Sequence, residues 1–215
     1  MTPRTRQAPR TLDSCAADAT RDRLAGMKLA LRVLIGVVIL VAIVLGIKQF
    51  PKGAREVRGK STPAPQKIGE TFTSVEHGYS HRIPLGWEKK PAPPSKAVMI
   101  AAPESSGVSS NMVTTVEPYD GTLRAYVDTN IQSLKKSAVR EKVVSREFTT
   151  DSKTPAYKVK LQNKVKNTDV GQTMYFFQGA GDKKIVITWT APVELQAQLE
   201  PLFDACMKTF ALSPR

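Results

Sequence analysis

The chain has 215 residues and carries 32 Lys and Arg against 19 Asp and Glu, a net charge of +13. Residues 1–60 hold 12 basic and 4 acidic residues, which leaves 20 and 15 for residues 61–215. Most of the excess therefore flanks an apolar segment, where basic residues meet anionic lipid, and this placement argues against a nucleic-acid-binding protein.

The N-terminal segment, residues 1–27, is polar, carries several arginines and lacks apolar periodicity. Such a composition predicts a disordered basic tail. Met27 begins the stretch MKLALRVLIGVVILVAIVLG, which is typical of a signal or signal-anchor sequence. Translation from Met27, with Met1 a misassigned start, is therefore an alternative to a cytoplasmic tail.

An apolar run extends from Val33 to Ile47 without a charged or polar side chain. A helix rises about 1.5 Å per residue, so the run covers roughly 22 Å of a hydrocarbon core about 30 Å thick. Lys28 and Arg32 can lengthen the span by directing their charges toward the head groups. We predict that residues 28–48 form one transmembrane signal-anchor, uncleaved because no A-x-A site ends the run.

The remaining residues divide into a linker and one domain. Residues 49–69 are rich in Pro, Gly, Lys and Ser, which predicts a linker that lifts the domain off the bilayer. Residues 70–215 have the usual size of one domain. Cys206 is the only cysteine in that range, so no intradomain disulfide is possible, and its place on an apolar stripe predicts a small core residue.

The first half of the domain shows strand and then helix patterns. Apolar and polar residues alternate around residues 96–101 and 112–117, as they do in strands. Thr122 then provides an N-cap for an amphipathic helix. The apolar face of that helix comprises Leu123, Tyr126, Val127, Ile131 and Leu134.

The second half repeats this order. Strands are predicted at residues 143–148, 157–162, 172–178 and 183–190, each with one solvent-facing side. A closing helix follows, with Pro192 in its first turn and Pro201 kinking or restarting it. The order predicts an α+β domain in which helices pack on an antiparallel β-sheet.

A motif at the start of the domain is similar to a known pattern. Phe72, Thr73 and Ser74 precede the stretch GYSHRIPLGW, residues 78–87. This arrangement resembles the opening hairpin of the PsbP/DcrB-like superfamily, and residues 121–136 and 201–212 resemble its middle and closing helices. The resemblance implies a PsbP-like α/β/α sandwich and an accessory or binding role. This sequence departs from the superfamily pattern at two positions: His81 stands where the superfamily usually has an apolar residue, and Ile83 stands where an aromatic residue is common.

The two histidines, His77 and His81, are spaced i, i+4. On a helix this spacing could chelate one metal ion, whereas on a strand it separates the side chains by about 13 Å. Gly78, Ser80 and Pro84 favour a strand, so we expect exposed polar histidines rather than a shared metal site. A turn at Gly78 would change that expectation.

A basic segment follows the motif and offers a candidate binding surface. Lys89, Lys90 and Lys96 surround a Pro-rich stretch beside Trp87. Solvated loops and a structural Trp87 are the ordinary interpretation. A ligand- or metal-binding surface of Trp87, the three lysines, His77 and His81 is the alternative.

The sequence shows no G-x-S-x-G elbow, no Gly-rich phosphate loop and no coherent catalytic set. We assign no catalytic residue, cofactor or metal. The expected function is a non-enzymatic accessory domain that binds or stabilises an envelope protein, single-pass in the inner membrane with its domain periplasmic. Alternatives are an extracytoplasmic ligand- or metal-binding module, a hydrolase of unrecognised geometry, and a domain facing the cytoplasm at anionic lipid.

Overall fold

The computed structural model describes residues 67–93, 96–103, 109–136, 144–165 and 168–213. The predicted tail, the apolar run from Val33 to Ile47 and nearly all of the linker lie outside these ranges. Neither helix of the described part has the length and apolar character needed to cross a membrane.

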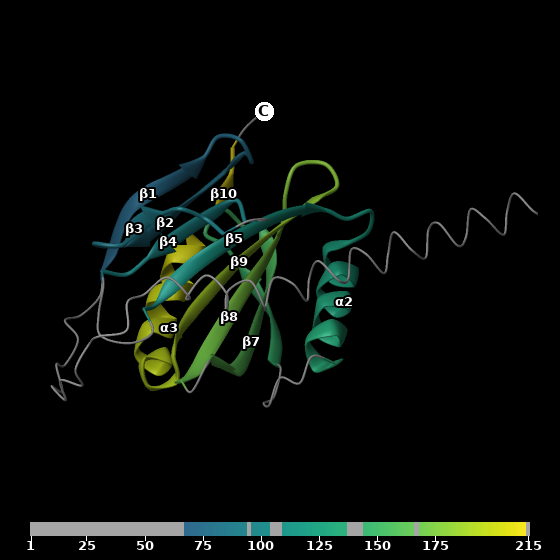
Figure 1. Cartoon of the computed structure of the whole chain (residues 1–215). Helices are drawn as coiled ribbons and strands as arrows, with labels where there is room; N and C mark the ends of the chain where they lie inside the picture. Colours follow the sequence, from purple (N-terminus) through teal and green to yellow (C-terminus); the bar gives the residue numbers. More distant parts are fainter. Residues whose placement is uncertain (1–66, 94–95, 104–108, 137–143, 166–167, 214–215) are drawn as a thin grey trace, which may run out of the picture.

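The domain contains ten strands and two helices within the described ranges (Figure 1). The helices are α2 (Leu123–Lys136) and α3 (Val193–Lys208). The strands are β1 (Ile68–Ser74), β2 (Tyr79–Pro84), β3 (Glu88–Lys90), β4 (Val98–Ala101), β5 (Asn111–Pro118), β6 (Val144–Thr149), β7 (Pro155–Val165), β8 (Thr168–Gln178), β9 (Lys183–Pro192) and β10 (Ala211–Leu212).

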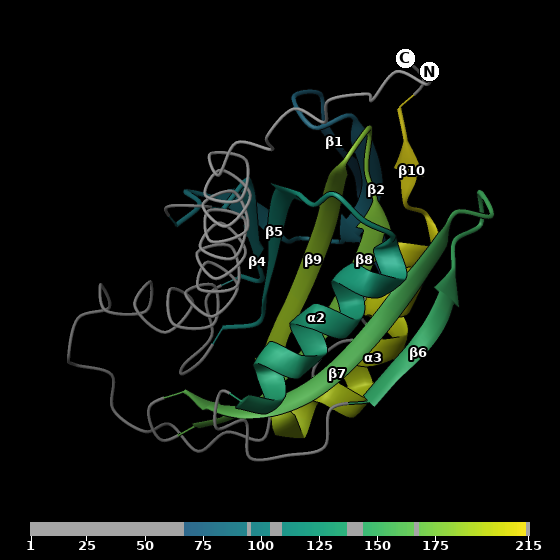
Figure 2. The ribbon, with the colours of Figure 1, turned by 90° about the vertical axis from the view of Figure 1, so that its right-hand side faces the viewer.

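The strands form two antiparallel sheets. The larger has the order β3-β4-β5-β9-β8-β7-β6, and the smaller has the order β1-β2-β10. Helix α2 lies on one face of the larger sheet, while α3 and the smaller sheet lie on the other (Figures 1 and 2). The predicted antiparallel sheet with helices packed on it is confirmed, although the opening hairpin belongs to a separate sheet.

The central strands β8 and β9 are buried on both faces. On β8, Tyr175 and Phe177 point toward α3, while Met174 and Phe176 point toward α2. The prediction that each strand has one solvent-facing side is therefore wrong for these strands. Helices cover both faces of the sheet at these strands. Odd-numbered and even-numbered side chains point to opposite faces, and both sets are therefore buried.

The core on the α3 side is rich in stacked aromatic rings. Trp189 stacks on Phe203 of α3 with ring centroids 4.3 Å apart, and Trp87 meets the same Phe203 edge-on at 6.1 Å. Cys206 of α3 is fully buried in this core, as predicted, and burial raises the pKa of its thiol to about 12. These contacts join α3 to the larger sheet and to the segment after β2.

Both helices follow from local sequence features. The Thr122 Oγ1 accepts a hydrogen bond from the Ala125 backbone N–H at 3.1 Å, so Thr122 caps α2 as predicted. Pro192 precedes the first residue of α3 and needs no backbone N–H there. Helix α3 runs continuously through Pro201, so the predicted restart at this residue does not occur.

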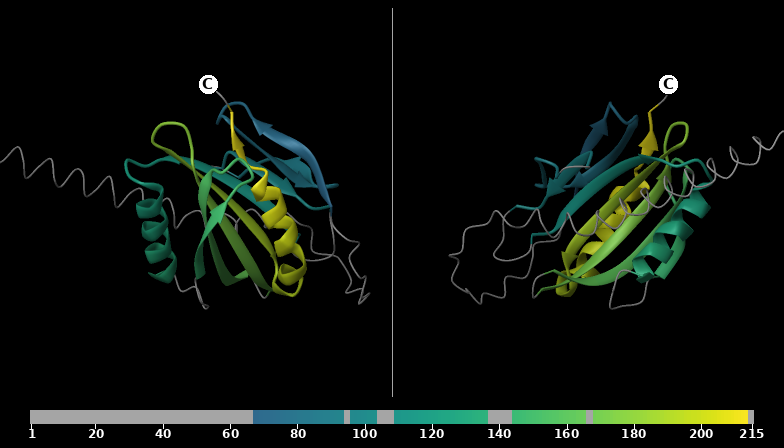
Figure 3. Two further views of the ribbon diagram at one scale, coloured as in Figure 1. Left: turned by 180° about the vertical axis from the view of Figure 1, so that it is seen from behind. Right: turned by 45° about the vertical axis from the view of Figure 1, so that its right-hand side comes forward.

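The smaller sheet connects the two ends of the domain. A turn at Gly78, whose φ is +66°, joins β1 to β2. Strand β10 pairs with the other edge of β2, where Ala211 lies opposite Ser80. Figure 3 shows the blue β1–β2 hairpin and the yellow C-terminal strand on the same side of the larger sheet as α3. This hairpin carries both histidines.

Candidate functional site

The two histidines occupy different environments. His77 lies in the turn between β1 and β2, and its Nε2 is 4.0 Å from a carboxylate oxygen of the exposed Glu76. His81 lies on β2 and is only 1% exposed. The expectation of an exposed His81 is wrong, because the smaller sheet packs this position against the domain core.

His81 is held as a neutral ring. Its Nδ1 lies 3.0 Å from the Arg82 carbonyl oxygen, which can only accept, so Nδ1 carries the proton. The ring stacks on Tyr79 and approaches Phe72, while its buried Nε2 has no hydrogen-bond partner in the described structure. Burial lowers the pKa of His81 to about 4, although the Arg82 carbonyl opposes this shift. His81 therefore contributes to packing.

The basic segment after β2 does not form one continuous surface. Trp87 is 5% exposed and packs in the α3-side core, which favours its structural interpretation. Lys89 and Lys90 are neighbours on β3, so they point to opposite faces of the sheet. Lys90 pairs with Glu88 at 2.8 Å. Lys96 is partly buried, with its Nζ 3.3 Å from Thr115 Oγ1, and burial lowers its pKa to about 8.

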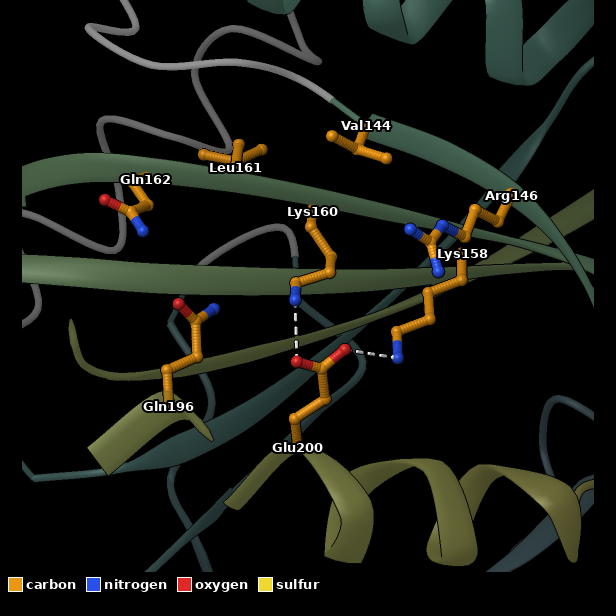
Figure 4. Close-up of a pocket in the computed structure, with 8 residues that line it drawn as sticks. All are labelled: Val144, Arg146, Lys158, Lys160, Leu161, Gln162, Gln196 and Glu200. Atoms are coloured by element: carbon orange, nitrogen blue, oxygen red, sulfur yellow. Dashed lines mark hydrogen bonds and ion pairs between the residues drawn. The ribbon is translucent and has the colours of Figure 1, made fainter. Parts of the chain in front are cut away.

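A cavity of about 310 Å³ lies between the β6–β7 edge of the larger sheet and α3 (Figure 4). We call it the β7–α3 cleft. Its lining combines three cations, one carboxylate, two amides and two aliphatic residues: Val144, Arg146, Lys158, Lys160, Leu161, Gln162, Gln196 and Glu200.

The β7–α3 cleft exists because alternate residues of β7 face α3. Lys158 and Lys160 lie on that side, whereas Val159 packs in the core beneath α2. On β8, Gly171 leaves room for the Gln196 side chain of α3, which would collide with a Cβ atom at this position. The cleft is therefore lined from one strand face and one helix flank.

An ion-pair network forms the floor of the cleft. Lys158 Nζ donates to Glu200 Oε1 at 2.7 Å and to the two carboxylate oxygens of Asp204 at 2.7 and 2.8 Å. Lys160 Nζ donates to the other Glu200 oxygen at 2.6 Å. Figure 4 shows Glu200 between the two lysines. The spacing of Glu200 and Asp204, i and i+4, places both carboxylates on one side of α3.

The network shifts the pKa values of Glu200 and Tyr175. Burial alone would raise the pKa of Glu200, but hydrogen bonds and charges from Lys158 and Lys160 hold it below its usual value. Tyr175 donates to Asp204 Oδ1 at 2.5 Å, and burial, together with this carboxylate, raises the pKa of the phenol well above its usual value. Glu200 thus stays ionised, and both carboxylates are hydrogen-bonded, which suits recognition better than proton transfer.

Arg146 completes the cleft. It is exposed on β6 and lies directly opposite Lys158 of β7. Lys158 is neutralised by α3, but the guanidinium of Arg146 has no ion-pair or hydrogen-bond partner within the described ranges. The cleft therefore keeps a positive charge on its open side.

Sequence reasoning missed this site. The alternation of Lys158, Lys160 and Gln162 with apolar residues predicts a solvent-facing strand side, whereas α3 covers this side in the structure. The available signal was the matching pair of carboxylates, Glu200 and Asp204, on one flank of the closing helix. Separately, no three His, Cys, Asp or Glu side chains of the described part gather closely enough to hold a metal ion.

Comparisons with known proteins agree with this architecture. The family model described as DcrB matches residues 83–209, more than half of the chain. The solution structure of cyanobacterial PsbP (CyanoP) from Synechocystis is similar, with TM-score 0.50 and 14% identity over 76% of this chain and 99% of that one. No curated protein matches the chain.

Two further solved structures have lower similarity. The Saccharomyces cerevisiae Ran-binding protein Mog1p has TM-score 0.49 and 12% identity, over 68% of this chain and 96% of that one. A Bacteroides thetaiotaomicron crystal structure has TM-score 0.47 and 13% identity, over 68% of this chain. The chain spans about half, 49%, of that Bacteroides protein.

Proposed function

This chain belongs to the DcrB family, and from that premise we propose that it is a non-enzymatic accessory protein that binds or stabilises another envelope protein. In this proposal residues 28–48 form a single-pass anchor in the inner membrane, and the domain works on the periplasmic side. The uninterrupted apolar run from Val33 to Ile47 supports the anchor.

The observation that carries the binding role is the state of the charged groups at the β7–α3 cleft. Glu200 and Asp204 are engaged by lysines, Tyr175 donates to Asp204, and the pKa of Glu200 is held below its usual value. A general base needs a free lone pair within reach of its substrate. The carboxylate oxygens here already accept hydrogen bonds from the protein, while the cleft and its exposed cation suit non-covalent recognition.

Cross-linking in cells tests the partner. A photo-reactive residue at exposed Ser145 beside the cleft, or at exposed Glu88 on the opposite edge strand, should yield a discrete adduct with an envelope protein. The same group at exposed Gln132 on α2 samples the remaining face. Absence of a discrete adduct from all three positions, in a chain of normal abundance, would contradict the proposed function.

Protease accessibility tests the placement. In spheroplasts, externally added protease should degrade the domain of the full chain if it lies outside the inner membrane. Protection until the membrane is lysed would instead support the cytoplasmic alternative at anionic lipid. A cytoplasmic marker protein, intact before lysis, is the control.

A second candidate is an extracytoplasmic ligand-binding module, favoured by the cavity of about 310 Å³. The geometry favours the cleft over His77 and His81, because the free nitrogen of His81 is buried. Calorimetry of the full chain compares the two possible sites, because divalent ions probe the histidines and small anions probe the cleft. No heat and no thermal shift with any of them would dispose of this candidate.

A further inference from the structure

The β7–α3 cleft has an unbalanced arrangement of charge. Arg146 and Lys158 face each other on neighbouring strands, and like charges directly opposite one another destabilise a sheet. Glu200 and Asp204 neutralise Lys158 from α3. Among the described residues nothing performs the same task for Arg146. An anion from outside the domain would complete the arrangement.

Lys160 lines the same cleft as Arg146, and its ammonium group has donors left for a further hydrogen bond. Its side chain is 38% exposed and makes one described hydrogen bond, to Glu200, whereas an ammonium group has three donors. Figure 4 shows Arg146, Lys158 and Lys160 reaching into the same cavity from two neighbouring strands. A guanidinium fork beside an ammonium group is an arrangement that binds carboxylates through charge-assisted hydrogen bonds.

We propose that the β7–α3 cleft binds a carboxylate-bearing ligand, with Arg146 and Lys160 holding the carboxylate and the amides of Gln162 and Gln196 lining the remainder. This goes beyond the proposed function, because it assigns a site and a ligand class irrespective of where the domain works. The carboxylate can belong to a free small molecule or to an acidic side chain of a peptide.

The charge and size of the cleft select this ligand class. Glu200 lies in the lining, so a phosphate monoester, which concentrates two negative charges on one group, meets more repulsion there than a carboxylate group, which carries one. A volume of about 310 Å³ is at the lower end of ligand pockets, which suits a ligand the size of an acidic amino acid. Val144 adds an aliphatic contact for the methylene groups of such a ligand.

Titration calorimetry of the full chain in detergent, at low salt, tests the proposal with glutarate as the probe. Glutaramide, which has the same carbon skeleton without charge, is the matched control ligand. Glutarate should bind and glutaramide should not. Arg146→Gln and Lys160→Gln should each weaken glutarate binding about tenfold or more, since each removes a charge-assisted hydrogen bond to the carboxylate.

The control variant is Lys89→Gln, which removes the same charge from exposed β3 and should leave the affinity unchanged. Arg146 is exposed, so its variant should keep the parental thermal midpoint, and this separates lost binding from lost folding. Absence of glutarate binding, equal binding of glutaramide, or unchanged affinity in Arg146→Gln would each overturn the proposal.

Two further ligands test whether the bound carboxylate comes from a peptide or from a small molecule, and whether the cleft prefers carboxylate to phosphate. A capped tripeptide with a central glutamate that binds more tightly than glutarate supports the proposal and assigns the carboxylate to a protein partner. Tighter binding of glutarate supports it and assigns a free small molecule. Inorganic phosphate that binds better than either ligand would overturn the carboxylate assignment. Failure to find a cross-linked partner leaves all these results interpretable, because they do not depend on that partner.

Discussion

The two faces of the larger sheet are packed by different means. On the α3 side, stacked rings from β9, α3 and the segment after β2 form an extensive core, joined by the smaller sheet. On the α2 side, one helix contributes three buried residues, Tyr126, Val127 and Leu134, to a smaller cluster. Both sides hold buried polar groups. The α3 side has His81 and the Lys158 ion-pair network, and the α2 side has Lys184, which is 1% exposed and donates to the Tyr119 and Asp182 carbonyl oxygens.

Buried polar groups on the α3 side are accommodated in two ways. The α3 side accepts a buried imidazole by keeping it neutral, and it accepts a buried lysine by supplying two carboxylates. Both solutions require a rigid surrounding, since an unpaired buried charge is costly. The α2 side has the smaller apolar cluster, so truncation of its apolar side chains should have smaller effects on stability.

Removal of an aromatic ring from the α3 side should have the largest effect. Phe203→Ala deletes a side chain that is 1% exposed and touches both tryptophans, so we expect a loss of about 3–5 kcal/mol in unfolding free energy. Leu134→Ala on α2 should cost about 2 kcal/mol, at the lower end for its type. Urea denaturation of the full chain measures both. Equal losses would break the comparison between the faces.

Acid should destabilise the α3 side through His81. Its pKa is about 4 in the folded protein against an ordinary 6.5, so folding favours the neutral ring. The resulting stability is fully present above pH 6.5 and declines as the pH falls toward 4, by about 3 kcal/mol in total. Burial is the larger cause of this shift and the hydrogen bond to the Arg82 carbonyl is the smaller, opposing one, while the Arg82 Nε donates to the Gly69 carbonyl at 2.8 Å.

The control for this prediction is His81→Leu, which has a similar volume and cannot titrate. Urea denaturation at pH 7, 6, 5 and 4.5 should show a steeper loss in the parent chain than in this variant. Parallel curves would mean that His81 is not the group responsible.

The ion-pair network should give an intermediate effect. Lys158→Ala leaves Glu200 and Asp204 facing each other without their shared cation. Because these carboxylates are partly exposed, we expect a loss of about 2 kcal/mol, below the range for a fully buried pair. Lys183→Ala, at an exposed position of β9, should change the unfolding free energy by less than about 0.5 kcal/mol. A Lys158 variant indistinguishable from it would show that the network contributes no stability.

On the α2 side, loss of the helix cap at Thr122 should have a smaller effect than Phe203→Ala, the titration of His81 or Lys158→Ala. Thr122→Ala removes the Oγ1 that accepts the Ala125 N–H, so a loss of about 1 kcal/mol is expected. Thr122→Ser keeps an acceptor and should recover most of it. Thermal unfolding followed by circular dichroism measures both, and an effect as large as that of Phe203→Ala would reverse the ranking of the faces.

Local patterns in the sequence predicted the elements well. The spacing of apolar residues from Leu123 to Leu134 and the cap at Thr122 are features of neighbouring residues, and they give α2 directly. The alternation in β5 and β7 is local in the same sense. The resemblance to the PsbP/DcrB-like superfamily is confirmed by the DcrB match and extends that local information to the whole domain.

Features that depend on long-range packing were not predictable in this way. The burial of His81 results from the contact of the smaller sheet with α3, which no periodicity in β2 reveals. The β7–α3 cleft joins Lys158 to Glu200 and Asp204, about forty residues further along the chain. A strand with lysines on one side is the same pattern whether water or a helix with carboxylates covers it.

The pairing of β10 with β2 has a consequence for the timing of folding. The earliest hairpin of the domain is completed by its last strand, and α3, which covers the aromatic core, is also made last. Contacts between distant parts of a chain form slowly because a long loop must first close. A ribosome-bound chain that has not yet released residues 193–212 therefore lacks its α3-side core, and the domain can reach its final state only after those residues emerge.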